Sequence, residues 1–164
     1  MKNKKNILIA GFGSEILMDD GIACRLVNKL KCRFDNKTFD YLIEPVGSLE
    51  LIEKFKGYQY IFIIDSIKTN YNVPGNLTFY KSGQFTETIN LTNKHDIALH
   101  TVISTARALN LPITENIYLI TIEGKEFLRF GENFSEDIEN KFDVILNEVA
   151  NYIRKKIKKH HIYN

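Results

Sequence analysis

Three side chains that could act together on a metal ion or on a peptide bond are Asp20, Asp65 and His95. Two carboxylates and one imidazole suit a divalent transition metal, and imidazole is a good ligand for nickel or zinc. Each residue also has a structural alternative. Asp65 could cap a helix or form an ion pair, and His95 could be exposed or cap a helix. Asp19 and Asp20 could cap a helix and compensate its dipole. Only a joint position in the fold can therefore give these residues a shared chemical role.

Strand-like and helix-like segments alternate along the chain. This pattern predicts a doubly wound domain, a three-layer α/β/α fold with a mixed, mostly parallel five-stranded sheet. The predicted strands are 6–10, 40–46, 58–67, 76–80 and 116–123. The predicted helices are 20–34, 49–56, 95–109 and a long final helix for which Ser135 is the expected cap. The strand after the Pro74–Gly75 turn is expected to run antiparallel.

The predicted strand directions bring several loops to one edge of the sheet. In open α/β sheets, ligands bind beyond the carboxyl ends of the parallel strands. Asp65 ends the most apolar predicted strand, where a carboxylate is costly unless it is paired, solvated or bound to a cation. Asp20 follows the first strand, and His95 begins a helix whose N-terminus should face the same edge. We therefore expect the three side chains to meet there.

Composition limits the classes of protein that need to be considered. The 164 residues suffice for one domain, and 44% hydrophobic with 26% charged residues is ordinary for a globular protein. A net charge of +2 is too small to indicate a nucleic-acid-binding protein. The basic tail 154–164 is interpreted either as a solvated end or as a docking surface for an acidic partner. Without a signal peptide or an apolar run of membrane length, a cytoplasmic protein with no membrane partner is expected.

Two further features bear on the type of site. The Gly11–Gly13 turn invites a dinucleotide-binding interpretation, but Ile16 stands where the third glycine of that motif would be. A receiver or nucleotide-binding domain remains a third alternative, weakened because the acidic pair lies well beyond the first strand. Cys24 and Cys32 fit neither a disulfide framework nor a zinc signature, and both are expected to be reduced.

Several segments together resemble the hydrogenase maturation endopeptidases. Residues 7–22, ILIAGFGSEILMDDGI, resemble the N-terminal signature of that family, which is a strand, a glycine turn, a hydrophobic stretch and an acidic pair with glycine. The remaining matches, in chain order, are the strand end at Asp65, the Pro74–Gly75 turn, the histidine in 94–99, and 122–124 with Phe130, Gly131 and Ser135. The order of these segments covers nearly the whole chain. The resemblance implies a phosphorylase/hydrolase-like fold and one maturation-protease-like domain over 1–164.

The resemblance also implies an activity and a site. Asp20, Asp65 and His95 would be the catalytic residues and would bind a divalent metal, with Asp20 rather than Asp19 aligned with the ligand. The protein would be a hydrolase, an aspartyl-type endopeptidase that removes a C-terminal extension from the large-subunit precursor of a nickel–iron hydrogenase after nickel insertion. The nickel would come with this partner, and zinc or cadmium could substitute for it. No nucleic-acid partner is implied.

Two routes to hydrolysis stay open. A metal could polarise the carbonyl or activate a water, or Asp20 or Asp65 could act as a carboxylate general base. The chain also departs from the family pattern, since Ser14 stands where asparagine is usual. The expected substrate loop, with Glu44, Gly47 and Ser48, lacks the usual glycine–threonine feature. A non-catalytic, nickel-dependent binding or chaperone module of the same fold is therefore the alternative function.

Overall fold

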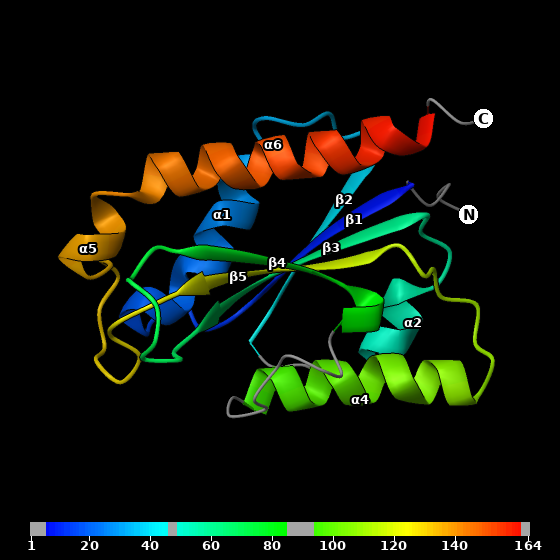
Figure 1. Ribbon diagram of the computed structural model, residues 1–164, viewed down its shortest axis with the longest axis horizontal. Coiled ribbons are helices and arrows are strands. Elements are labelled where there is room, and N and C mark those ends of the chain that lie inside the picture. Colours follow the sequence, from blue (N-terminus) through cyan, green and yellow to red (C-terminus); the bar gives the residue numbers. More distant parts are fainter. Residues whose placement is uncertain (1–5, 46–48, 85–93, 162–164) are drawn as a thin grey trace.

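A five-stranded sheet lies between two layers of helices (Figure 1). The computed structural model describes residues 6–45, 49–84 and 94–161, with only the backbone for 83, 94–98 and 159–161. The strands are β1 (Ile7–Phe12), β2 (Phe39–Glu44), β3 (Tyr60–Ile67), β4 (Leu77–Lys81) and β5 (Ile117–Glu123). The helices are α1 (Ile22–Leu30), α2 (Leu51–Phe55), α4 (Lys94–Ala108), α5 (Glu136–Glu139) and α6 (Phe142–His161), with 3₁₀ turns η1 (Met18–Gly21) and η2 (Ser82–Gln84).

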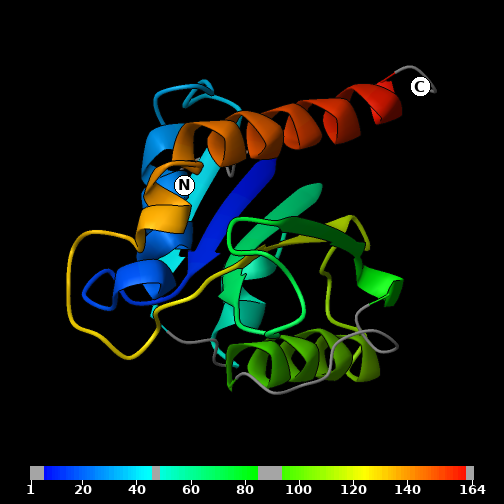
Figure 2. The ribbon, with the colours of Figure 1, turned by 60° about the vertical axis from the view of Figure 1, so that its left-hand side comes forward.

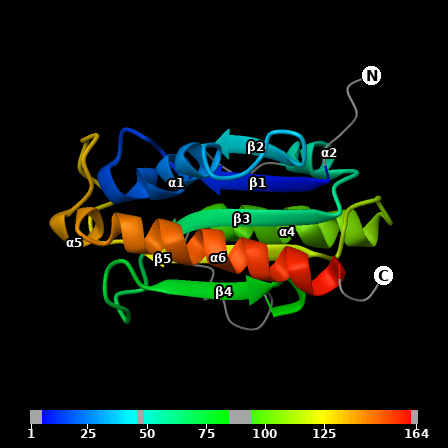
Figure 3. The same cartoon turned by 90° about the horizontal axis from the view of Figure 1, so that it is seen from above.

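The sheet is mixed and mostly parallel. Its strand order is β2-β1-β3-β5-β4, and only the pair of β4 with β5 is antiparallel among the described strands. Seen from above, α6 lies along the sheet over β3, β5 and β4 (Figure 3). Helices α1 and α6 cover one face, while α2 and α4 cover the other. The predicted three-layer α/β/α fold and the antiparallel strand after Pro74–Gly75 are therefore confirmed.

The central strands are apolar because both of their faces are covered. Every residue of β1 and β5 is buried, and β3 is buried except at its last residue. Alternate side chains enter two separate cores, so that Ile64 faces α1 and α6 while Ile63 faces α2 and α4. The inward stripe predicted for the first helix is confirmed, since all its members are fully buried: Ile22, Ala23, Leu26, Val27 and Leu30.

Two helix predictions were wrong in detail. The first helix starts at Ile22 with Gly21 in the capping position, so Asp19 is not its cap. The final helix is divided into α5 and α6, and Ser135 precedes the short α5 without a capping hydrogen bond from its side chain. The cause is the same in both cases, because the Ser135 hydroxyl donates to the Asp19 carboxylate instead.

The basic end of the chain continues the last helix. Residues 154–161 form the final turns of α6, with Arg154, Lys155 and Lys158 exposed. In the part of the chain that the structure describes, no helix has the length and apolar character to cross a membrane.

Candidate functional site

A glycine at the end of β1 turns the chain so that Asp20 returns to the sheet edge. Gly13 has φ +140°, and a β-carbon there would lie 2.1 Å from the carbonyl oxygen of Asp20. No other residue fits such a contact, because the backbone atoms themselves would have to move. The turn therefore places η1, which carries Asp19 and Asp20, directly at the carboxyl end of β1.

Ser66 joins the two predicted catalytic acids. Its hydroxyl donates to Asp20 Oδ1 at 3.1 Å, and its amide donates to Asp65 Oδ1 at 2.8 Å. The other oxygen of Asp20 accepts the Ser14 amide at 2.7 Å. Asp20 is 9% exposed and Asp65 is 2% exposed. These contacts place Asp20 at the end of β3, where Asp65 precedes Ser66 in the chain. A site shared by the two carboxylates stays a prediction.

The two acids approach the end of β3 from different sides. Alternation along β3 turns Ser66 toward α1, as it does Ile64, and turns Asp65 toward the α2 and α4 side, as it does Ile63. Asp20 reaches Ser66 from η1. The two carboxylates therefore lie on either side of the end of β3.

Part of the predicted site falls outside the described residues. His95 is the second residue of α4, whose first turn lies at the same end of the sheet as the tip of β5 (Figure 1). The side chain of His95 is outside the described set, so its contact with the acids stays a prediction. Gly47 and Ser48 also lie outside it, while Glu44 ends β2 and forms an ion pair with Lys54 of α2.

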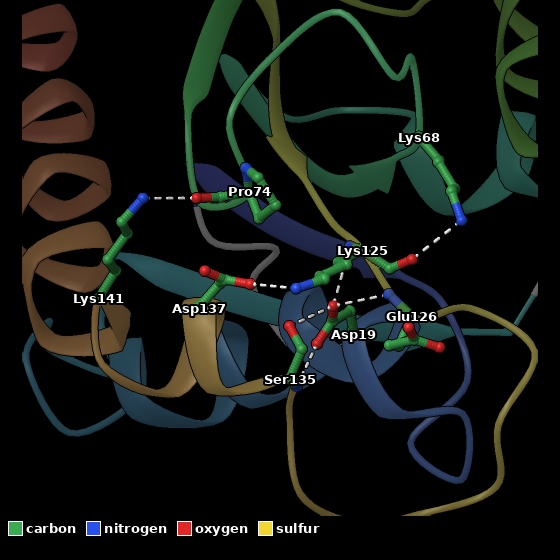
Figure 4. Close-up of polar contacts among 8 residues, drawn as sticks. All are labelled: Asp19, Lys68, Pro74, Lys125, Glu126, Ser135, Asp137 and Lys141. Carbon is green, nitrogen blue, oxygen red and sulfur yellow. Dashed lines mark hydrogen bonds and ion pairs between the residues drawn. The ribbon is translucent and has the colours of Figure 1, made fainter.

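Asp19 is a structural acid that the sequence did not reveal. It is fully buried, and its carboxylate accepts four hydrogen bonds: from the Lys125 and Glu126 amides at 2.9 Å, and from the Ser135 amide and hydroxyl at 2.7 Å (Figure 4). These donors lie more than 100 positions away, with separations of 106, 107 and 116. The neighbouring acids therefore have different roles, with Asp19 holding the segment after β5 and Asp20 facing the sheet edge.

The segment after β5 loops around the turn that contains η1 before it reaches α5, and it contacts this turn at several positions (Figure 2). The Met18 amide donates to the Gly131 carbonyl at 3.0 Å, and the Gly131 amide donates to the Ile16 carbonyl at 3.1 Å. Gly124 packs so tightly that a β-carbon would lie 2.6 Å from the ring of Phe127. The loop after β1 and the loop after β5 therefore hold each other in place through these backbone hydrogen bonds.

Side chains also connect the other loops at this end. Lys68 donates to the Lys125 carbonyl at 3.0 Å, and Lys125 pairs with Asp137 at 2.8 Å (Figure 4). Lys141, which lies between α5 and α6, donates to the Pro74 carbonyl at 2.7 Å. The Glu123 carboxylate takes part in similar contacts. It accepts hydrogen bonds from the amide and the hydroxyl of Thr69 at 2.7 and 2.8 Å.

Comparison with known proteins identifies the fold. No family model and no curated protein matches the sequence. Among solved structures, a hydrogenase maturating endopeptidase, HybD, from E. coli superposes with a TM-score of 0.79 at 20% identity, covering 92% of this chain and 93% of that one. An endopeptidase from Escherichia coli gives 0.75 at 22% identity, covering 92% and 93%. The [NiFe] hydrogenase maturation protease HybD from Thermococcus kodakarensis gives 0.68 at 22%, covering 90% and 98%.

This chain has the fold of the hydrogenase maturation endopeptidases. The match spans nearly the full length of both chains, so it includes the sheet edge that carries Asp20 and Asp65. The fold expected from the sequence segments and the fold found by superposition therefore agree.

Within this endopeptidase fold, the thiol nearest to the acids is not a nucleophile. Cys24 is fully buried on α1, and its sulfur contacts the Gly13 carbonyl at 3.5 Å. Burial first, and then the charges of Glu15 and Asp20, raise the pKa of this thiol to about 12. A thiolate is therefore scarce at neutral pH.

The Asp20 carboxylate keeps acceptor capacity beyond its two hydrogen bonds. Each carboxylate oxygen has about two lone-pair sites, and the hydrogen bonds from Ser14 and Ser66 use one on each oxygen of Asp20. Among the side chains that the structure describes, no group of three His, Cys, Asp or Glu is placed to hold a metal ion. His95 is outside that set, so the three-ligand site is a proposal that depends on this histidine.

Proposed function

We propose that this chain is an endopeptidase that removes a C-terminal extension from the large-subunit precursor of a nickel–iron hydrogenase after nickel insertion. The observation that supports the proposal is the hydrogen bond from the Ser66 hydroxyl to Asp20, which brings Asp20 to the end of β3, where Asp65 precedes Ser66. Support also comes from the fold, which is shared with proteins named as hydrogenase maturation endopeptidases or proteases. We also propose a cytoplasmic location.

The nickel is part of the substrate in this proposal. Asp20, Asp65 and His95 would contribute ligands to a nickel ion that the precursor already holds through its thiolates. A site with only three protein ligands leaves coordination positions open for such donors. A precursor without nickel would lack the shared ion and would bind poorly. The enzyme would therefore act as a checkpoint as well as a peptidase.

The protein's own residues fix the geometry of this site. The Ser14 amide and the Ser66 hydroxyl hold the two oxygens of Asp20, so the carboxylate cannot rotate freely. The Ser66 amide orients Asp65 in the same way. Asp19 keeps the loop after β5 packed on η1. This packing fixes the backbone next to Asp20 in space. Preorganised ligands of this kind lower the cost of binding a docked ion.

A non-catalytic, nickel-dependent binding or chaperone module is the second candidate function. One observation favours it, because the carboxylate of Glu44, the last residue of β2 before the altered loop, is engaged by Lys54. An acid that is committed to an ion pair within the protein is less available to a substrate. Such a module would bind the precursor and leave its length unchanged.

The test is to mix the purified protein with nickel-loaded precursor and measure the intact mass of the precursor. We expect a product shortened by the C-terminal extension. Asp20→Ala, Asp65→Ala and His95→Ala should each abolish cleavage while thermal unfolding remains cooperative. Asp143→Asn is the control, since it removes the charge of an exposed carboxylate on α6. Normal cleavage by all three alanine variants would refute the site, and binding without cleavage by the wild type would favour the second candidate.

Metal content provides a separate check. The purified protein should bind added divalent metal only weakly, because the proposed site is incomplete without the precursor. Elemental analysis after dialysis should find much less than one ion per chain. Tight, stoichiometric zinc would instead indicate a conventional metallohydrolase.

A further inference from the structure

The hydroxyl of Thr121 on β5 is buried without a hydrogen-bond partner among the described residues. Thr121 is 2% exposed, and its Oγ1 atom is buried. Nearly all buried hydroxyls in folded proteins find a partner, because an unsatisfied polar group is costly. An exception that persists next to a functional site requires an explanation, and a bound water or ligand is the usual one.

Thr121 lies beside Asp65. The two residues are register partners on the parallel strands β5 and β3. Register partners on neighbouring strands point to the same face, and the strands are about 4.8 Å apart. On that face the preceding pair is Leu119 with Ile63, which are fully buried in the core against α2 and α4. The threonine and the aspartate are therefore the first polar pair above this core, at the edge where the substrate would arrive.

Burial limits the size of any ligand that could contact both the Thr121 hydroxyl and the Asp65 carboxylate. Both Asp65 and Thr121 are 2% exposed, so a long side chain has no direct approach to the hydroxyl. A polar separation beyond hydrogen-bond distance is commonly bridged by one water molecule. A buried water needs two to four polar partners, and a hydroxyl together with a carboxylate provides both a donor and acceptors.

We propose that the Thr121 hydroxyl holds the hydrolytic water next to Asp65. The inference rests on the proposed endopeptidase function. In the reaction, the water oxygen bonds to the peptide carbonyl carbon and the C–N bond breaks. The two hydrogens of the water end on the new carboxyl and amino groups. Thr121 contributes orientation, because a second hydrogen bond fixes the direction of the water's lone pair toward the carbonyl carbon.

On the opposite face of the sheet, at Ser66, the polar groups are arranged differently. Ser66 and Asp20 satisfy each other's hydrogen bonds directly, at 3.1 Å. Thr121 lies on the other face of the sheet and makes no such bond within the described residues. The polar groups on the Ser66 side of the strand end therefore satisfy each other, and the Thr121 side offers a hydroxyl to a small exchangeable ligand.

Thr121→Val tests the proposal because valine keeps the shape of threonine and removes the hydroxyl. With nickel-loaded precursor, we expect kcat to fall roughly tenfold while KM is unchanged, as for loss of one hydrogen bond in the transition state. Thr121→Ser should restore kcat to within about threefold of the wild type. Thr78→Val is the matched control, since Thr78 is the partner of Thr121 on β4, one strand further from Asp65, and should leave kcat unchanged.

Three results would overturn the proposal. The first is an unchanged kcat in Thr121→Val, or an equal loss in Thr78→Val. The second is a higher KM at constant kcat, which would assign the hydroxyl to precursor binding. The third is a lower thermal midpoint in Thr121→Val, because loss of a hydroxyl without a partner in the protein should leave the midpoint unchanged or raise it.

A crystal structure separates this inference from the proposed function. In the wild type we expect an ordered water within hydrogen-bond distance of both Thr121 Oγ1 and the Asp65 carboxylate, and we expect the valine variant to lack it. A wild type that fails to cut the precursor would refute the endopeptidase function. A wild-type structure without this water would refute the water site whatever the activity.

Discussion

Removal of the Asp19 carboxylate should destabilise the protein more than removal of any exposed acid. Asp19→Ala leaves the Lys125, Glu126 and Ser135 amides and the Ser135 hydroxyl without their acceptor, all in a fully buried location. Hydrogen bonds to a charged group contribute about 1.5–3 kcal/mol each. The four bonds share one carboxylate and are not additive, so we expect the free energy of unfolding to fall by about 3–5 kcal/mol.

Asparagine provides a graded version of the same perturbation. Three donors converge on Asp19 Oδ2, and only the Ser135 amide donates to Oδ1. An amide oxygen at the Oδ2 position would keep the three bonds, while its NH₂ group would face the remaining amide donor. Asp19→Asn should therefore cost less than alanine, about 1–3 kcal/mol.

Urea denaturation of both variants measures these differences, with Asp137→Asn as the control. The Asp137 carboxylate pairs with the Lys125 ammonium in a solvent-accessible position, so its loss should change the free energy of unfolding little. Hydrogen exchange should show faster exchange at the Lys125, Glu126 and Ser135 amides in Asp19→Ala. Equal stability of Asp19→Ala and Asp137→Asn would refute the structural role of Asp19.

Three further predictions concern the site itself. Gly13→Ala should destabilise the fold and abolish cleavage, because the alanine β-carbon would lie 2.1 Å from the Asp20 carbonyl oxygen. A variant that unfolds and cleaves like the wild type would contradict this. Ser66→Ala should slow cleavage roughly tenfold but lower the free energy of unfolding by only about 1 kcal/mol, and unchanged kinetics would show that its hydroxyl does not orient Asp20. Buried Cys24 should resist iodoacetamide at about pH 8 while exposed Cys32 reacts, because the pKa of Cys24 is raised to about 12; equal modification in peptide mass spectra would contradict it.

Strand direction made much of the fold and part of the site predictable. The apolar runs of β1, β3 and β5 are continuous because both faces are covered, and this pattern is visible in the sequence. Once those strands are parallel, their carboxyl ends share one edge. The meeting of Asp20 with the end of β3 follows from that geometry and from the glycine turn at the end of β1.

The roles of Asp19, Ser66 and Thr121 could not be predicted, because they depend on contacts between distant segments. The donors to Asp19 lie more than 100 residues away, and nothing near it in the sequence marks them. From the sequence, Asp19 could equally well have capped the following helix. Only the observed hydrogen bonds show that it holds the segment after β5 instead. The unsatisfied hydroxyl of Thr121 depends on the register of β3 with β5, which strand patterns alone do not fix.

The most direct test of the central claim is the affinity of the protein for its precursor with and without nickel. Binding of fluorescently labelled precursor should be much tighter when nickel is present, and Asp20→Ala or Asp65→Ala should remove that difference. Equal affinity for the nickel-loaded and nickel-free precursor, unaffected by either substitution, would show that the two acids do not share the substrate's ion.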